Sequence, residues 1–193
     1  MMVDFVYDHT TVPDDPKLNA LWRAKTLELT SIDHPKAEKL RQSIRELCRK
    51  DFWYWSRGFA WVHEARILDD EADIEDLDTK VAFLPWPHQI PVVDHILKVL
   101  GKRDFRLVKS RAQGATWLMI LVAVWLWLFR RGSIVNFVSK DENAVDKKGD
   151  MNAIFQKIDW LLAVLPVWMV GKKGKDWNRN HGAHTFTRTD GET

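Results

Sequence analysis

The fold of this chain is decided by one stretch and the apolar run behind it: Arg106-Leu107-Val108-Lys109-Ser110-Arg111-Ala112-Gln113-Gly114-Ala115-Thr116, then thirteen apolar residues from Trp117 to Phe129. Residues 106–108 favour a short strand and 109–116 a loop that contains glycine. The apolar run favours a helix, because Arg130-Arg131-Gly132 supplies the cations and glycine typical of a helix C-terminus. Strand, loop and helix in this order are the context of a phosphate loop, in which N–H groups at the helix N-terminus face an anion.

The loop matches the pattern G-x-x-x-x-G-K-[ST] at Gly114 and Thr116 only. Lys109 stands in place of the first glycine, and Ala115 in place of the usual lysine. A loop folded around phosphates brings both of its ends near them, so Lys109 can supply the missing charge, with Arg111 as a second, bidentate cation. Thr116 is placed to bind Mg²⁺ through its hydroxyl. The alternative is that Gly114 only relaxes a turn and that both cations are solvated.

Composition and charge place the chain among globular proteins. It has 193 residues, of which 46% are hydrophobic and 29% charged. Residues 1–100 carry 13 basic and 18 acidic groups, whereas residues 101–193 carry 16 basic and 9 acidic groups. The positive charge therefore accompanies the loop, where a polyanion is expected. A single cysteine, Cys48, excludes an internal disulfide and fits a reducing cytoplasm. We find no signal peptide, and the run 117–129 falls short of the roughly 20 residues that span a bilayer.

The first half of the chain favours helices. After a loose arm over residues 1–15, helices are expected over Pro16–Leu29 and from near Pro35 to about Lys50, since proline suits a first helical turn. The aromatic segment Phe52–Val62 favours the core of a helical subdomain; a base-stacking platform would need exposed rings.

A second region is expected to follow an acidic linker, because Asp69–Asp78 holds seven acidic residues in ten. We therefore divide the chain into a helical N-terminal subdomain, residues 1–80, and an α/β region, residues 81–193. In the α/β region, a helix is expected over about Pro91–Leu100, a strand over Ile134–Ser139 and a helix over about Ala144–Leu165. Strand and helix alternate, which predicts a parallel sheet.

The C-terminal segment contains a basic loop that is either solvated or in contact with a DNA backbone. Its candidate cations are Lys172, Lys173, Lys175 and Arg179. His181 and His184 make a poor metal site and are expected to be structural or surface residues. Ala183–Thr189 favours a strand and Asp190-Gly191 a hairpin turn. The returning strand is missing, so we expect the chain to be the N-terminal part of a longer protein.

Three features together resemble the large terminase subunits of tailed phages, the ATPases that pump DNA into procapsids. Residues 109–117 resemble their deviant Walker A motif, K-S-R-x-x-G-A-[ST]-W. Leu84-Pro85-Trp86-Pro87-His88-Gln89 resembles their adenine-recognition motif, with Gln89 lying 20 residues before Lys109. The aromatic run 51–55 resembles their N-terminal helical region, and residues 135–142 resemble the strand after their phosphate-loop helix.

The resemblance implies a role for each matching residue. Gln89 would bond the adenine edge, while Lys109 and Arg111 would contact the β- and γ-phosphates of ATP. Gly114 would allow close backbone approach, and Thr116 would bind Mg²⁺. The rest of the nucleotide site would be Ser110, Gln113 and Ala115. Ala112-Gln113 departs from the family, whose members often have a polar and then an apolar residue. The acidic Walker B pair and the nuclease domain are expected downstream, so hydrolysis would belong to the full-length protein.

The implied fold is an incomplete P-loop NTPase-type α/β sheet after a helical N-terminal subdomain. The implied function is an ATPase motor that translocates double-stranded DNA in the host cytoplasm, transiently on the procapsid. Its partners would be double-stranded phage DNA, a portal protein, a small terminase subunit and further copies in a ring. Two alternatives stay open. One is a helicase or restriction-type DNA translocase, against which Ala115 argues. The other is a non-catalytic interaction module with a degenerate loop.

Overall fold

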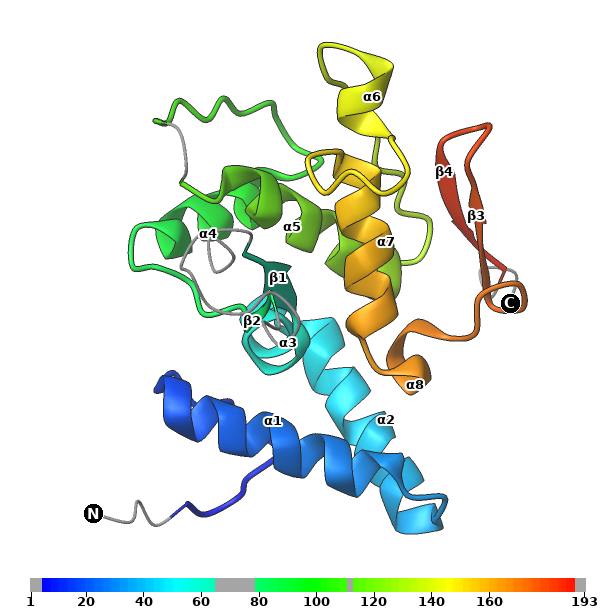
Figure 1. The fold of residues 1–193 in the computed structure, drawn as a ribbon. Coiled ribbons are helices and arrows are strands. Elements are labelled where there is room, and N and C mark those ends of the chain that lie inside the picture. Colours follow the sequence, from blue (N-terminus) through cyan, green and yellow to red (C-terminus); the bar gives the residue numbers. More distant parts are fainter. Residues whose placement is uncertain (1–4, 65–78, 111–112, 190–193) are drawn as a thin grey trace, which may run out of the picture.

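The computed structural model describes residues 5–64, 79–110 and 113–189. It is a mixed structure in which helices dominate and the strands form two small sheets. α1 and α2 lie at the end of the molecule opposite to α6, and the β3–β4 hairpin stands beside α7 (Figure 1). The helices are α1 (Pro16–Ser31), α2 (Pro35–Lys50), α3 (Phe52–Phe59), α4 (Gln89–Val99), α5 (Ala115–Phe129), α6 (Glu142–Val145), α7 (Ile154–Val164) and α8 (Val167–Val170). The strands are β1 (Trp61–His63), β2 (Lys80–Ala82), β3 (Trp177–Asn180) and β4 (Thr185–Arg188).

The predicted N-terminal helical region is confirmed, and side-chain caps explain where its helices begin. The carboxylate of Asp15 accepts hydrogen bonds from the backbone N–H groups of the first turn of α1. The ring of His34 caps α2 through the N–H of Lys36, at 3.1 Å. The carboxylate of Asp51 caps α3 in the same way. α1 and α2 each continue with a proline, whose fixed φ suits a first turn.

A buried arginine fixes α1 against the end of α3. Arg23 donates to the backbone oxygens of Arg57 and Ala60 at 2.6 and 2.9 Å, and to the side-chain oxygen of Asn19 at 2.7 Å. These bonds satisfy carbonyls at a helix C-terminus, where intrahelical partners run out. Burial lowers the pKa of Arg23 to about 9. The guanidinium also lies 4.5 Å from the ring centroid of Trp61, which offsets part of its lost hydration.

The apolar run forms the central helix α5, as predicted. α5 packs among α3, α4 and α7, and most of its side chains are buried. Trp125 donates its indole N–H to the backbone oxygen of Cys48 in α2 at 2.8 Å, and its ring meets Phe52 edge-on at 5.8 Å. Phe52 and its buried neighbours in α3 confirm that this aromatic segment packs in the core. No helix in the described parts of the chain is long and apolar enough to cross a membrane.

The predicted parallel sheet does not form within the described residues. β1 pairs antiparallel with β2 in the register Trp61↔Ala82, and β3 pairs antiparallel with β4 in the register Trp177↔Arg188. Residues 106–108 and 134–139, predicted as strands, are assigned to no strand, so neither pairs with the other. A strand is stable only when its backbone groups find a neighbouring strand, and among the described residues neither segment has one.

The predicted helix over Ala144–Leu165 is instead two helices, α6 and α7. Gly149 interrupts it with φ +80°, a left-handed conformation that glycine adopts without strain. The predicted strand near residues 183–189 is confirmed as β4. Its partner β3 includes Arg179, which we had placed in a basic loop.

The hydrophobic core is continuous on both sides of residue 80: it joins Trp22 and Trp55 to Leu121 and Trp177. The division into two domains at that point stays a prediction. The acidic segment Asp69–Asp78 and the turn at Asp190-Gly191 lie outside the described residues.

Candidate nucleotide-binding site

The predicted loop ends at the N-terminus of α5. Gly114 is the N-cap residue, with φ +70° and ψ 7°, and no side chain caps the helix. The first intrahelical bond runs from the N–H of Leu118 to the carbonyl of Gly114, at 3.1 Å. The N–H groups of Ala115, Thr116 and Trp117 therefore have no acceptor within the helix, and together with the helix dipole they favour an anion.

Gln89, the predicted adenine-reading residue, lies against this helix end. It is the first residue of α4 and is 6% exposed. Its Oε1 accepts from the backbone N–H of Trp86 at 3.0 Å, and its Nε2 donates to the carbonyl of Gln113 at 3.2 Å. A side-chain amide has two N–H donors and two acceptor lone pairs. One donor and one lone pair remain, which is the set that reads an adenine edge.

The contact between the two motifs also explains why residue 114 is glycine. A Cβ at this position would lie 2.9 Å from Nε2 of Gln89, and the backbone is in the left-handed region. Both effects disfavour any larger residue. The loop pattern includes Gly114, but the sequence alone does not indicate that its neighbour is Gln89.

Trp86, whose backbone N–H donates to the buried amide of Gln89, has an exposed side chain. Trp86 is 45% exposed, and its ring centroid lies 5.5 Å from that of His88 at an interplanar angle of 44°. An exposed indole can stack on a flat ligand, whereas the backbone of the same residue holds the amide of Gln89.

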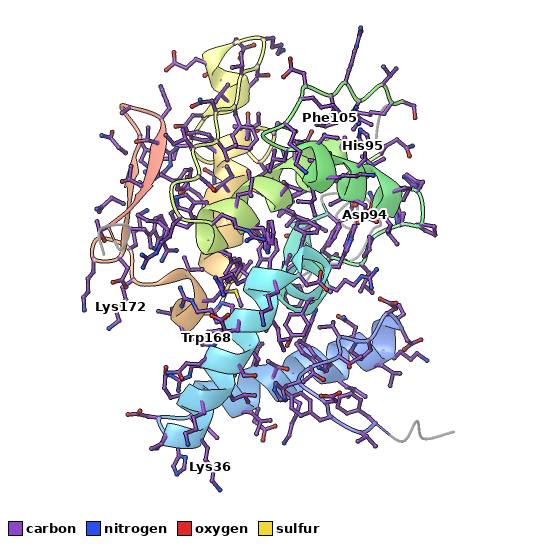
Figure 2. All side chains as sticks on the ribbon, turned by 180° about the vertical axis from the view of Figure 1, so that it is seen from behind. Lys36, Asp94, His95, Phe105, Trp168 and Lys172 are labelled. Carbon is purple, nitrogen blue, oxygen red and sulfur yellow. The ribbon has the colours of Figure 1, made fainter. Side chains whose placement is uncertain are left out.

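The basic residues at the start of the loop are exposed, in contrast to the buried Gln89. Lys109 and Ser110 lie exposed in the extended segment that leads into the loop. Phe105 ties the start of this segment to α4 through the ring of His95, at 6.4 Å between centroids (Figure 2). The structure thus brings Gln89, Gln113 and Gly114 together and leaves Lys109 and Ser110 on the approach to the loop. Arg111 and Ala112 lie outside the described residues.

Thr116, the predicted Mg²⁺ ligand, is exposed in the first turn of α5. The described residues contain no group of three or more His, Cys, Asp or Glu side chains that could hold a metal ion. Magnesium in nucleotide sites keeps several waters and takes phosphate oxygens as ligands, so one or two protein ligands suffice. A hydroxyl at the first helical turn is compatible with that arrangement.

The four candidate DNA-binding cations fall into two groups. Lys172, Lys173 and Lys175 are exposed between α8 and β3, where Lys172 reaches the surface (Figure 2). The ammonium of Lys173 lies 5.5 Å from the ring centroid of Trp177, which is buried and so cannot stack on a base. Phosphate contact is the role that remains open to these lysines.

Arg179 points inward instead. Its side chain is 0% exposed and forms ion pairs with Asp146 at 2.5 Å and Asp159 at 3.2 Å. The guanidinium also lies near the rings of Phe155 and Phe186, at 5.0 and 4.6 Å from their centroids. We therefore leave Arg179 out of the DNA surface: its charge is already used to hold the β3–β4 hairpin on α7.

His184 belongs to the same cluster, which agrees with a structural role. Its Nδ1 lies 2.8 Å from Asp146 and its Nε2 3.2 Å from Glu142. The hydrogen bond with Asp146 raises the pKa of His184 above its ordinary value. Burial alone would raise the pKa of Asp146, but hydrogen bonds from Arg179 and His184 outweigh it and lower that pKa.

Comparisons of the chain with protein-family models, with curated proteins and with solved structures found no match. What the chain does is therefore inferred from its motifs and from the geometry at the N-terminus of α5.

Proposed function

We propose that this chain binds Mg·ATP at the N-terminus of α5, and that it is the N-terminal part of the ATPase motor of a phage large terminase, which translocates double-stranded DNA into the procapsid. The observation that carries the proposal is the hydrogen bond from Gln89 to the carbonyl of Gln113, next to Gly114. The segment of Gln89 and the glycine-containing loop are far apart in the sequence but in contact in the structure. This contact supports the proposal that one nucleotide is bound by both.

The proposed site divides the nucleotide among its residues. The N–H groups that open α5 face the phosphates, and Lys109 and Arg111 add the charge that Ala115 lacks. The free donor and lone pair of Gln89 bond the adenine edge. Thr116 binds Mg²⁺, which neutralises the phosphate oxygens.

The first test is a calorimetric titration of the chain with Mg·ATP. We expect saturable binding that Lys109→Ala weakens by about tenfold or more, because a hydrogen bond to a charged group contributes about 1.5–3 kcal/mol. Lys102→Ala is the matched control: it removes the same charge from an exposed position after α4 and should leave the affinity unchanged.

The role of Gln89 must be tested by a measurement that a purely structural role would not change. Gln89→Ala should reduce the preference for ATP over GTP, because the amide reads the base and not the phosphates. If both nucleotides weaken equally, Gln89 only supports the loop. If the folded chain binds neither nucleotide, the nucleotide-site proposal is wrong.

A non-catalytic interaction module is the second candidate. It is favoured by Ala115 in place of the usual lysine, and by the protein partners that Gln89 already has while it is 6% exposed. A folded chain that binds no nucleotide but still engages a protein partner would favour this candidate.

A further inference from the structure

A cavity of about 970 Å³ lies at the other end of α5. It is a groove between the C-terminal half of α5, α7, the segment 132–137 and β4. Its floor is apolar and includes Trp127, Leu128, Phe155 and Phe186. The volume is at the upper end of the roughly 300–1,000 Å³ of ligand pockets, so it has room for several side chains.

One wall of the groove is residues 132–137, which belong to no helix or strand. Ile134 and Val138 are 87% and 91% exposed, and Phe137 lines the groove. Among the described residues, no strand pairs with 134–139. A backbone of this kind is a template for strand addition, in which an extended peptide supplies the missing hydrogen bonds and places alternate side chains in a neighbouring pocket.

The rim of the groove indicates the charge of such a peptide. Among the described residues that line the groove are five arginines, from α2, from the end of α5 and from β4, and one glutamate, which pairs with Arg49: Arg45, Arg49, Arg130, Arg131 and Arg188, with Glu46. The guanidinium groups of Arg130 and Arg188 lie over the rings of Trp125 and Trp127, each 5.0 Å from the centroid. Stacking holds these cations in place, and a planar guanidinium suits a carboxylate.

We propose that this groove docks an extended, acidic segment of a partner protein, which adds as a strand along residues 134–138. Its alternate apolar side chains enter the groove, and its carboxylates meet the arginines at the rim. The proposal is independent of nucleotide binding, because the groove and the candidate nucleotide site lie at opposite ends of α5.

The test is a fluorescence-polarisation titration of the chain with a labelled peptide in which valine and threonine alternate between aspartate ends. We expect saturable binding that weakens as salt is raised, and at least tenfold weaker binding when asparagine replaces aspartate in the peptide. No saturable binding, or equal binding of both peptides, would overturn the proposal.

Proline variants then test the backbone contact. Successive N–H groups of an extended chain point in opposite directions, so Val135→Pro and Asn136→Pro remove donors on opposite sides. We expect one of the two to weaken peptide binding at least tenfold and the other less than twofold. Val108→Pro, in the exposed segment before the loop, is the control and should have no effect. Equal effects of all three would overturn the strand-addition geometry. Dimerisation of the chain that Asn136→Pro or Val135→Pro abolishes would show that a second copy fills the groove, and would overturn the acidic-partner proposal.

Discussion

Replacing Gly114 with alanine tests the contact on which the candidate site depends. The new Cβ would lie 2.9 Å from Nε2 of Gln89, whose amide holds the carbonyl of Gln113. Alanine in a left-handed conformation costs about 1–2 kcal/mol. Displacing Gln89 forfeits a hydrogen bond worth about 1 kcal/mol. We therefore expect Gly114→Ala to lower the free energy of unfolding by about 2–3 kcal/mol in total.

Gly101 offers a matched control, because it has the same φ of +70° and a Cβ there would meet nothing within 4 Å. Gly101→Ala should carry the backbone cost alone, about 1–2 kcal/mol. The effect of alanine on the unfolded chain is the same at both positions and cancels in the comparison. The difference of about 1 kcal/mol isolates the contact with Gln89.

The assay is urea unfolding followed by tryptophan fluorescence, for which the chain carries 11 tryptophans. In a Gln89→Ala background, Gly114→Ala should cost no more than Gly101→Ala, since the contact is gone. If the two glycine variants agree within about 0.3 kcal/mol in the unaltered chain, Gln89 does not press on the helix N-terminus and our account of the site fails.

The buried ion-pair cluster gives the remaining predictions. Arg179→Leu should lower the free energy of unfolding by about 3–5 kcal/mol, because it leaves buried carboxylates without their cation. As a control, Arg49→Leu in the exposed pair with Glu46 should change the free energy of unfolding by less than about 1 kcal/mol. Equal losses of the two variants in denaturant unfolding would refute the buried pairing. The depressed pKa of Asp146 stabilises the fold above its ordinary value of 3.8, and this contribution is lost as the pH falls through the folded value. The raised pKa of His184 stabilises the fold below its ordinary value of 6.5, and this contribution is lost as the pH rises through the folded value. Unfolding at a series of pH values should show greatest stability between these limits. His184→Asn, in which asparagine tolerates the left-handed φ of +49°, should flatten the alkaline side, and it should also reduce the acid-side slope because His184 helps to lower the pKa of Asp146.

The helices could be predicted from the sequence because their signals are local. A proline in the first turn marks α1 and α2, and an unbroken apolar run marks α5. The strands could not be predicted in the same way. Residues 134–139 have the β-branched composition of a strand, but a strand needs a partner, and the described chain supplies none at this position.

The candidate site was predicted in part. The motifs singled out Gln89 and Gly114, and the structure places them side by side. Arg179 was misplaced because composition cannot distinguish a solvated cation from a buried one. Asp146, whose carboxylate pairs with Arg179, lies 33 residues away in the sequence, and only the folded hairpin brings the two side chains together.

Cys48 lies fully buried beneath Trp125, and burial raises the pKa of its thiol. Because the thiolate is the nucleophile, the native chain is nearly inert toward maleimides and iodoacetamides. A cysteine introduced at any exposed position would thus be the single labelling handle of the molecule. Dyes or spin labels can then be attached to one chosen element without first removing the natural sulfur.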